Sequence, residues 1–171
     1  NGFKQAGGNE AFPAITDQVT IDSRRIDSKN ALFIALEGKS VDGHRFISQA
    51  VEAGARFILA RKDWIPQDPL DNITLLKVDD PIKAFQEIAG VYRQQMPCRV
   101  IAIVGSYGKT MVKDLLQEML KTSFQVAASP ESFNSQIGVP LSLLTIRKEH
   151  QIALIEAGIS KKDEMDNLSR I

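Results

Sequence analysis

The sequence predicts an α/β protein in which a small N-terminal α/β domain is followed by part of a second domain with a parallel sheet. Short apolar runs rich in β-branched residues alternate with amphipathic segments, as strands and helices do in α/β folds. A glycine-containing turn and then Lys109-Thr110 separate one such run from one such segment. Pro97 interrupts the pattern, so we place the domains at residues 1–96 and 97–171.

The elements of the first domain follow in order. Residues 1 to about 18 are rich in Gly, Asn and Ala without periodicity, and a loop or frayed terminus is expected there. Strands are predicted at residues 19–21, 31–36, 56–60 and 73–78. A helix is predicted over residues 46–53, with Gly54 as its end. Asp79-Asp80-Pro81 supplies an acidic cap and a first-turn proline for the next helix.

The second domain is predicted from a repeated strand–loop–helix pattern. Residues 100–104 form an apolar run, and a helix is predicted from Lys109 onward. Its expected buried face consists of Val112, Leu115, Leu116, Met119 and Leu120. Further strands are predicted at residues 125–128 and 151–155. Doubly wound sheets commonly have about five or six strands, so a domain with three is expected to be cut short.

Composition and charge exclude several classes of protein. Hydrophobic residues make up 43% and charged residues 25% of the 171, as in ordinary globular proteins. The 21 Lys and Arg balance the 21 Asp and Glu, so net charge gives no support for nucleic acid or an anionic membrane as a partner. The one cysteine, Cys98, suits a reducing compartment. No apolar run approaches the ~20 residues of a membrane span and no signal peptide is visible, so a cytoplasmic protein is expected.

Residues 105–110, GSYGKT, lie between a predicted strand and a predicted helix, which is the arrangement that binds nucleotide phosphates. Gly105 and Gly108 allow backbone N–H groups to converge on phosphate oxygens. Lys109 would reach the terminal phosphates, and the Thr110 hydroxyl is placed to ligate a bridging magnesium ion. The general pattern GxxxxGK[ST] needs a glycine where Ile103 stands, so an ordinary loop before a helix is the alternative. The flanking elements favour phosphate binding, and we interpret the second domain as part of a parallel-sheet P-loop ATPase domain.

Two further polar residues are candidates for the same site. Glu156 follows a predicted strand, at the end where open parallel sheets bind ligands, and could complete a magnesium site with Thr110. The alternative is a solvated glutamate at a strand end. Asn134 lies in the polar loop SPESFNSQIGVP near the same edge, and turn chemistry is its simpler interpretation.

Candidates in the first domain are weaker. Asp22-Ser23-Arg24 ends a strand and offers a hydroxyl and a guanidinium that suit phosphate or carboxylate recognition, although a charged turn is the simpler interpretation. His44 follows Asp42-Gly43 in a loop, where a lone histidine is more often a surface group than a catalyst. Trp64 and Cys98 are interpreted as structural. No Ser/His/Asp or Cys/His arrangement in the sequence supports a prediction of nucleophilic catalysis.

Taken together, the ordered motifs are more specific than any one of them. The strings IDSRRI, ALFIALEG, VDGHRF, GSYGKT, FNSQIGVPLSLL and IEAGIS resemble, over about residues 19–168, the ATP-dependent Mur ligases of bacterial cell-wall synthesis. The most similar branch adds D-alanyl-D-alanine to UDP-N-acetylmuramoyl-tripeptide. The pattern is also similar to a fused form in which an alanine racemase follows the ligase.

The resemblance implies a role for each matching residue. It implies that ATP is held by Gly105, Ser106, Tyr107, Gly108, Lys109, Thr110 and Asn134. It implies that Mg²⁺ is bound by Thr110 and Glu156, and that the UDP-sugar is contacted by Ser23, Arg24, Gly38, Asp42, Gly43 and His44. Lys109 and Glu156 are the implied catalytic residues of a reaction in which a carboxylate attacks the γ-phosphate and an amine then displaces phosphate from the acyl phosphate.

Two departures from the family pattern and three alternatives remain open at this point. Tyr107 stands where the family usually has Asn, and Lys161 stands where many members have a histidine assigned to a second metal, so no second metal site is expected. The alternatives are the Mur ligase that adds the third amino acid, a UDP-sugar-binding module without catalysis, and an unrelated P-loop NTPase. The last leaves IDSRRI and VDGHRF unexplained.

Overall fold

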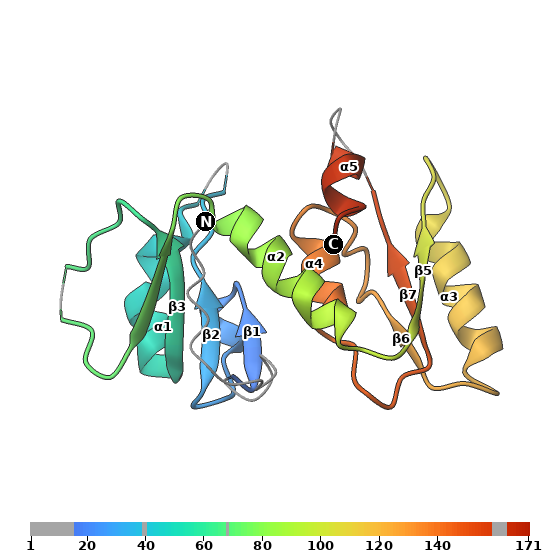
Figure 1. Ribbon diagram of the computed structural model, residues 1–171, viewed down its shortest axis with the longest axis horizontal. Coiled ribbons are helices and arrows are strands. Elements are labelled where there is room, and N and C mark those ends of the chain that lie inside the picture. Colours follow the sequence, from blue (N-terminus) through green and yellow to red (C-terminus); the bar gives the residue numbers. More distant parts are fainter. Residues whose placement is uncertain (1–15, 39–40, 68, 159–163) are drawn as a thin grey trace. The chain divides into compact units, whose positions relative to one another are not determined.

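The computed structural model describes residues 16–38, 41–67, 69–158 and 164–171. Contacts within the chain divide it into two compact units, residues 1–77 and 78–171 (Figure 1). Residues 1–15 of the loop predicted up to about residue 18, and the departure at Lys161, lie outside the described residues. No helix in the described parts of the chain has the length and apolar character needed to cross a membrane.

The first unit is built on a four-stranded sheet with the order β1-β2-β3-β4. Its strands are β1 (Gln18–Thr20), β2 (Ala31–Ile34), β3 (Ala55–Arg61) and β4 (Thr74–Val78). Strand β2 pairs in parallel with β1 and with β3. The single-turn helices η2 (Ser23–Arg25) and η3 (Gly43–Phe46) follow β1 and β2, and η3 leads into α1 (Ile47–Ala53). All four strands that the sequence predicts are confirmed, with ends shifted by at most two residues.

The core of the first unit joins α1 to β2 and β3. Buried residues of the three elements, and of the position just after β2, pack together; they are Phe33, Ala35, Ile47, Ala50, Ala55, Ile58 and Ala60. Helix α1 ends where predicted, because Gly54 has φ +124°, a left-handed value that residues with a Cβ avoid.

The second unit contains a parallel three-stranded sheet with the order β5-β7-β6. Its strands are β5 (Arg99–Ile103), β6 (Val126–Ala128) and β7 (Ile152–Glu156). Its helices are α2 (Pro81–Gln94), α3 (Lys109–Leu120), α4 (Gly138–Leu143) and α5 (Glu164–Leu168). Helix α3 lies on one side of the sheet, and α4 with α2 against it lies on the other (Figure 1). The expectation of three parallel strands is confirmed for the described residues.

Side chains of β7 point alternately to the two faces of this sheet. Ala153 and Ile155 join the core that α2 and α4 complete, whereas Leu154 and Glu156 take the alternate positions and so face the side of α3. The carboxyl end of the central strand therefore presents Glu156 toward the start of α3.

Helix α2 begins as predicted, because the Asp80 carboxylate accepts hydrogen bonds from the N–H groups of Ile82 and Lys83. Ala89 and Tyr92 belong to the core of the second unit, and the Tyr92 hydroxyl donates to the Ile146 carbonyl. Contacts thus assign α2 to the second unit, although it precedes the boundary predicted near Pro97. The domain ranges 1–96 and 97–171 stay a prediction.

The expected buried face of α3 is partly wrong. Val112, Leu115 and Met119 are 46%, 58% and 71% exposed. Helix α3 packs mainly on β6 and β7, and the residue it buries most is Lys113. Periodicity identifies an apolar stripe but does not say whether that stripe or the neighbouring one contacts the sheet.

Candidate active site

The GSYGKT segment forms the turn between β5 and α3. Gly105 and Gly108 have φ angles of +147° and +77°, both left-handed values that favour glycine. Gly108 is the N-cap of α3 and contributes no side-chain cap, so the amides of the first turn receive no side-chain acceptor from it. A twelve-residue helix concentrates partial positive charge at this end. The geometry suits an anion such as a phosphate group.

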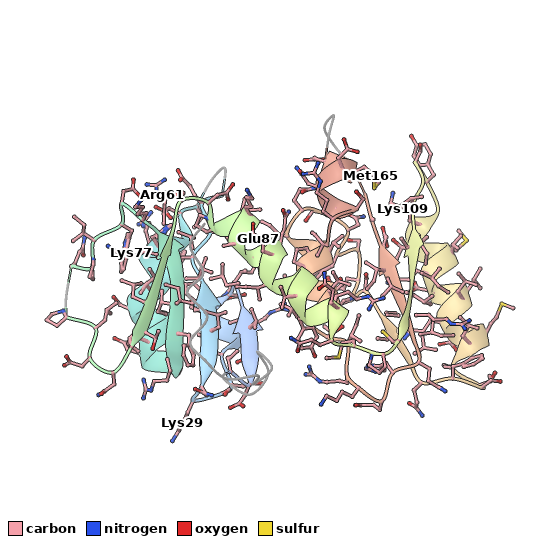
Figure 2. The ribbon with its side chains drawn as sticks, in the orientation of Figure 1. Lys29, Arg61, Lys77, Glu87, Lys109 and Met165 are labelled. Atoms are coloured by element: carbon pink, nitrogen blue, oxygen red, sulfur yellow. The ribbon has the colours of Figure 1, made fainter. Side chains whose placement is uncertain are left out.

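Lys109 lies at the start of α3 (Figure 2). Its ammonium donates a hydrogen bond of 2.9 Å to the Gly105 carbonyl and folds back over the turn. The contact is solvent-exposed, so the ammonium can exchange this carbonyl for a phosphate oxygen at little cost. The Tyr107 side chain, at the position where the family pattern differs, is 96% exposed.

Two other predicted residues, Thr110 of α3 and Asn134 of the loop before α4, meet at Glu156, which is 1% exposed. Its Oε2 accepts a hydrogen bond of 2.8 Å from the Thr110 hydroxyl, and its Oε1 accepts one of 2.7 Å from the Asn134 side-chain amide. Both donors are neutral, so neither of them supplies a positive charge to the carboxyl group. Parallel strand order explains the meeting, because β5 and β7 are neighbours and their carboxyl ends share one edge.

This cluster fits a magnesium ion better than a metal that needs several protein ligands. Magnesium commonly uses one or two carboxylates and completes its shell with phosphates and water, and Glu156 with the Thr110 hydroxyl supplies such a partial set of oxygen ligands. No group of three or more His, Cys, Asp or Glu able to hold a metal occurs among the described residues. The donor set therefore suits a cation that arrives with a nucleotide.

Sequence reasoning missed two residues of this region. Ser129, 2% exposed, accepts a hydrogen bond of 3.0 Å at its Oγ from the Glu156 N–H. Lys113, 3% exposed, donates to the carbonyls of Ser129 and Glu131. A lysine one helical turn after Lys109 is the only sequence signal for it, and that signal is weak because most helical lysines are solvated.

The predicted residues of the first unit lie after parallel strands, at their carboxyl ends. Ser23 is buried and donates a hydrogen bond of 2.8 Å to Gln49 of α1, whereas the Arg24 side chain is 79% exposed and pairs with Asp22. The hydrogen bonds from the Arg24 guanidinium are the main reason why the pKa of Asp22 is lowered to about 2. Arg24 is thus an exposed cationic group held in place by its neighbour.

His44 is buried rather than on the surface, which corrects the simpler sequence interpretation. Its Nδ1 lies 2.6 Å from Asp42 Oδ1, and its Nε2 accepts a hydrogen bond of 3.0 Å from the Arg61 N–H. The second contact requires a neutral ring with the proton on Nδ1. The His44 N–H also donates to Asp42, and this is the main reason that the pKa of Asp42 is lowered. His44 therefore ties the loop after β2 to the end of β3.

Gly43 allows this loop to pack against the backbone of Leu36. Its N–H donates to the Leu36 carbonyl at 2.8 Å, and a Cβ here would lie only 2.7 Å from that oxygen. Gly38 is also close to backbone, because a Cβ on it would lie 3.0 Å from the Val41 carbonyl oxygen. Gly38, Asp42, Gly43 and His44 are thus brought together by the fold, at the edge that also carries Ser23 and Arg24.

We expect Gly43→Ala to lower the free energy of unfolding by about 1–3 kcal/mol, because a methyl group cannot fit without moving backbone. Urea unfolding measures the change. Gly90→Ala is the matched control, since a Cβ at Gly90 in α2 meets its nearest atom at an ordinary 3.6 Å and alanine favours a helix. Equal stability of Gly43→Ala and the unsubstituted chain would contradict the tight contact.

Two parallel sheets, with a glycine turn and Lys-Thr at the start of α3, place the protein in the class of α/β proteins with a P-loop type of turn. Residues 16–93 match the Mur ligase family, catalytic domain, and residues 103–171 match the Mur ligase middle domain. The chain belongs to the Mur ligase family.

Relatives and solved structures agree with this assignment. The UDP-N-acetylmuramoyl-tripeptide--D-alanyl-D-alanine ligases of Bacillus subtilis and Escherichia coli are 39% and 37% identical to the chain, over 90% and 87% of its length. The match covers 33% and 32% of those proteins, so the chain spans about a third of their length.

Among solved structures, a crystal structure of MurF from Acinetobacter baumannii is 33% identical, with a TM-score of 0.77, over 89% of this chain and 32% of that one. MurF ligase from Thermotoga maritima in complex with ADP is 27% identical, with a TM-score of 0.76, over 90% of this chain and 34% of that one. The α/β fold class with parallel sheets is confirmed.

Proposed function

We propose that this chain is the N-terminal and central part of an ATP-dependent amide ligase that adds D-alanyl-D-alanine to UDP-N-acetylmuramoyl-tripeptide in peptidoglycan precursor synthesis. The meeting of Thr110, Asn134 and Glu156 beside the GSYGKT turn is the observation that carries the proposal. Relatives of that name and an ADP-bound neighbour support the choice of substrates and nucleotide. The cytoplasm, where these precursors would be made, is the proposed compartment.

In this proposal the residues of the second unit hold and neutralise the nucleotide. The backbone N–H groups of residues 105–110 and the Lys109 ammonium bind the phosphate chain. Glu156 and Thr110 would hold Mg²⁺, which would supply charge neutralisation at the transferred phosphoryl group. Asn134 keeps the Glu156 carboxylate turned toward the hydroxyl of Thr110.

The chemistry proposed is two successive displacements. A terminal carboxylate oxygen of the tripeptide attacks the γ-phosphorus while the bond to ADP breaks, which gives an acyl phosphate. The amine of D-alanyl-D-alanine then attacks the acyl carbon, the amide bond forms, phosphate leaves and the nitrogen loses a proton. Lys109 contributes by binding the negatively charged phosphate oxygens and keeping them in place. The protein therefore acts by positioning and electrostatics.

The first unit is proposed to bind the UDP-sugar at the carboxyl ends of β1 and β2. Arg24 offers an exposed guanidinium for a phosphate oxygen, and the loop with Asp42 and Gly43 lies at the same edge of the sheet. Ser23 and His44 are buried and already hydrogen-bonded, so we assign them to holding these segments rather than to direct contact with ligand.

Two measurements test the proposal. Calorimetry on the chain titrates UDP-N-acetylmuramoyl-tripeptide and Mg-ADP separately, and we expect binding of both. Binding of the UDP-sugar without nucleotide binding would support a binding module without catalysis, and would contradict a formed nucleotide site. A ligation assay on the full-length protein that carries this chain then compares the dipeptide with single amino acids as acceptors. A preference for diaminopimelate or lysine would instead indicate the ligase that adds the third amino acid.

A further inference from the structure

Lys113 is a buried lysine to which the proposed chemistry assigns no role. It stands in the second turn of α3, its side chain is 4% exposed, and its ammonium donates to Ser129 O at 2.9 Å and Glu131 O at 2.7 Å. Within the described parts of the chain its ionic partner is Asp114, at 3.3 Å, and that carboxylate is 61% exposed. Burying an ammonium is costly, and a methionine would fill the same space without that cost. The charge therefore needs a use beyond packing.

The two carbonyls that Lys113 binds open the loop that carries Asn134. Ser129 is fixed to β7 twice, because its N–H donates to the Leu154 carbonyl and its Oγ accepts from the Glu156 N–H. Lys113 takes the remaining backbone group of Ser129, its carbonyl. It thereby sets the direction in which the chain leaves the sheet.

Glu131 shows that the loop is bent sharply at the second carbonyl. It has φ +47°, a left-handed conformation that is unfavourable for a residue with a Cβ. Such a conformation persists where the surroundings hold it, and the hydrogen bond from Lys113 is a direct hold on this residue's carbonyl.

Asn134 lies three residues after Glu131 and is held in place by Gly158, which follows β7. Its carbonyl accepts a hydrogen bond of 2.8 Å from the Gly158 N–H, and a Cβ on Gly158 would lie 3.1 Å from the Asn134 Cγ. Its side-chain amide then reaches Glu156 Oε1 at 2.7 Å. A small shift of the loop would break this contact, because hydrogen bonds weaken steeply with distance and angle.

We propose that Lys113 is a positioning residue for the cation site: it fixes residues 129–131 so that Asn134 orients the Glu156 carboxylate toward Mg²⁺. This inference rests on the proposed function, since it assumes that Glu156 serves a cation bound with the nucleotide. Residues that orient a metal ligand commonly change metal affinity by about 10- to 100-fold when they are replaced.

The test is Lys113→Met in the full-length protein that carries this chain, with ADP and Mg²⁺ as probes. We expect the Mg²⁺ concentration for half-maximal ADP binding to rise about tenfold or more, whereas ADP binding without Mg²⁺ stays unchanged. Lys121→Met is the matched control, because Lys121 lies just after the same helix, is half exposed and pairs only with Glu118 among the described residues. It should leave both quantities unchanged.

A double-substitution cycle separates positioning from general destabilisation. If Lys113 acts through Asn134, Lys113→Met added to Asn134→Ala should raise the Mg²⁺ requirement by less than about twofold, since the contact is already lost. A full tenfold effect in that background would overturn the proposal. Lys113→Gln, which keeps an N–H donor, should restore part of the Mg²⁺ affinity.

The remaining outcomes are also decisive. If the unsubstituted protein shows no Mg²⁺-dependent ADP binding, the proposed function fails. If it does and Lys113→Met has the same Mg²⁺ requirement, the positioning role alone fails. If neither Lys113→Met nor Lys113→Gln folds, Lys113 acts in folding of the second unit, and the positioning role is overturned.

Discussion

Lys109→Ala is expected to weaken nucleotide binding and ligation by at least about a hundredfold, which is the loss typical when one charge-stabilising donor is removed from a reacting group. Lys109 begins α3 beside the turn and has an ammonium that holds only the exposed Gly105 carbonyl among the described residues. The free energy of unfolding should change by less than about 0.5 kcal/mol, because the side chain contributes no buried contact of note. Calorimetry with Mg-ADP and a ligation assay on the full-length protein measure the two effects.

Lys121→Ala serves as the control for Lys109→Ala, since it removes an equal charge from the other end of the same helix. The variant Lys109→Arg is informative as well. It keeps the charge but not the compact ammonium, so partial recovery of binding would assign the effect to charge rather than to shape. Wild-type nucleotide affinity in Lys109→Ala would remove the GSYGKT turn from the proposed site.

Most of the fold was predictable because its local signals agree with its tertiary structure. Asp80 and Pro81 start α2, Gly54 ends α1, and each apolar run became a strand of a parallel sheet. The buried face of α3 was not predictable in the same way. The helix has an apolar stripe with Val112 and Leu115, yet the sheet contacts the stripe that contains Lys113.

The candidate site was predictable to the extent that topology determines it. Strand ends share an edge in any parallel sheet, so Glu156 and Thr110 could be placed together from sequence. Contacts between residues far apart in the sequence, at positions that belong to no motif, could not be predicted from it. His44 is tied to the backbone of Arg61 seventeen residues away, and Lys113 to a loop sixteen to eighteen residues away. Neither contact leaves a periodic pattern in the sequence.

Glu156→Gln is expected to separate function from stability at the centre of the site. Glutamine can keep both hydrogen bonds, because its Oε1 accepts from Asn134 and its Nε2 can donate to the Thr110 hydroxyl, whose direction of donation reverses. It removes a buried negative charge, so the free energy of unfolding should equal or exceed that of the unsubstituted protein. It also removes the charged ligand for Mg²⁺. Ligation should fall by about a hundredfold or more, since charge stabilisation by a metal is worth several kcal/mol.

Glu156→Ala is the matched comparison, and it should change stability in the opposite direction. It leaves the Thr110 hydroxyl and the Asn134 amide, both part-buried, without their acceptor, and the cost approaches about 1–3 kcal/mol for each group that water does not reach. Urea unfolding of both variants and Mg²⁺ titrations of ADP binding give the four quantities needed. Retained Mg²⁺ dependence in Glu156→Gln would contradict the assigned cation site. A lower free energy of unfolding in Glu156→Gln would mean that a positive charge stabilises the Glu156 carboxylate in the fold. The carboxylate would then be buried for stability and not for binding a metal.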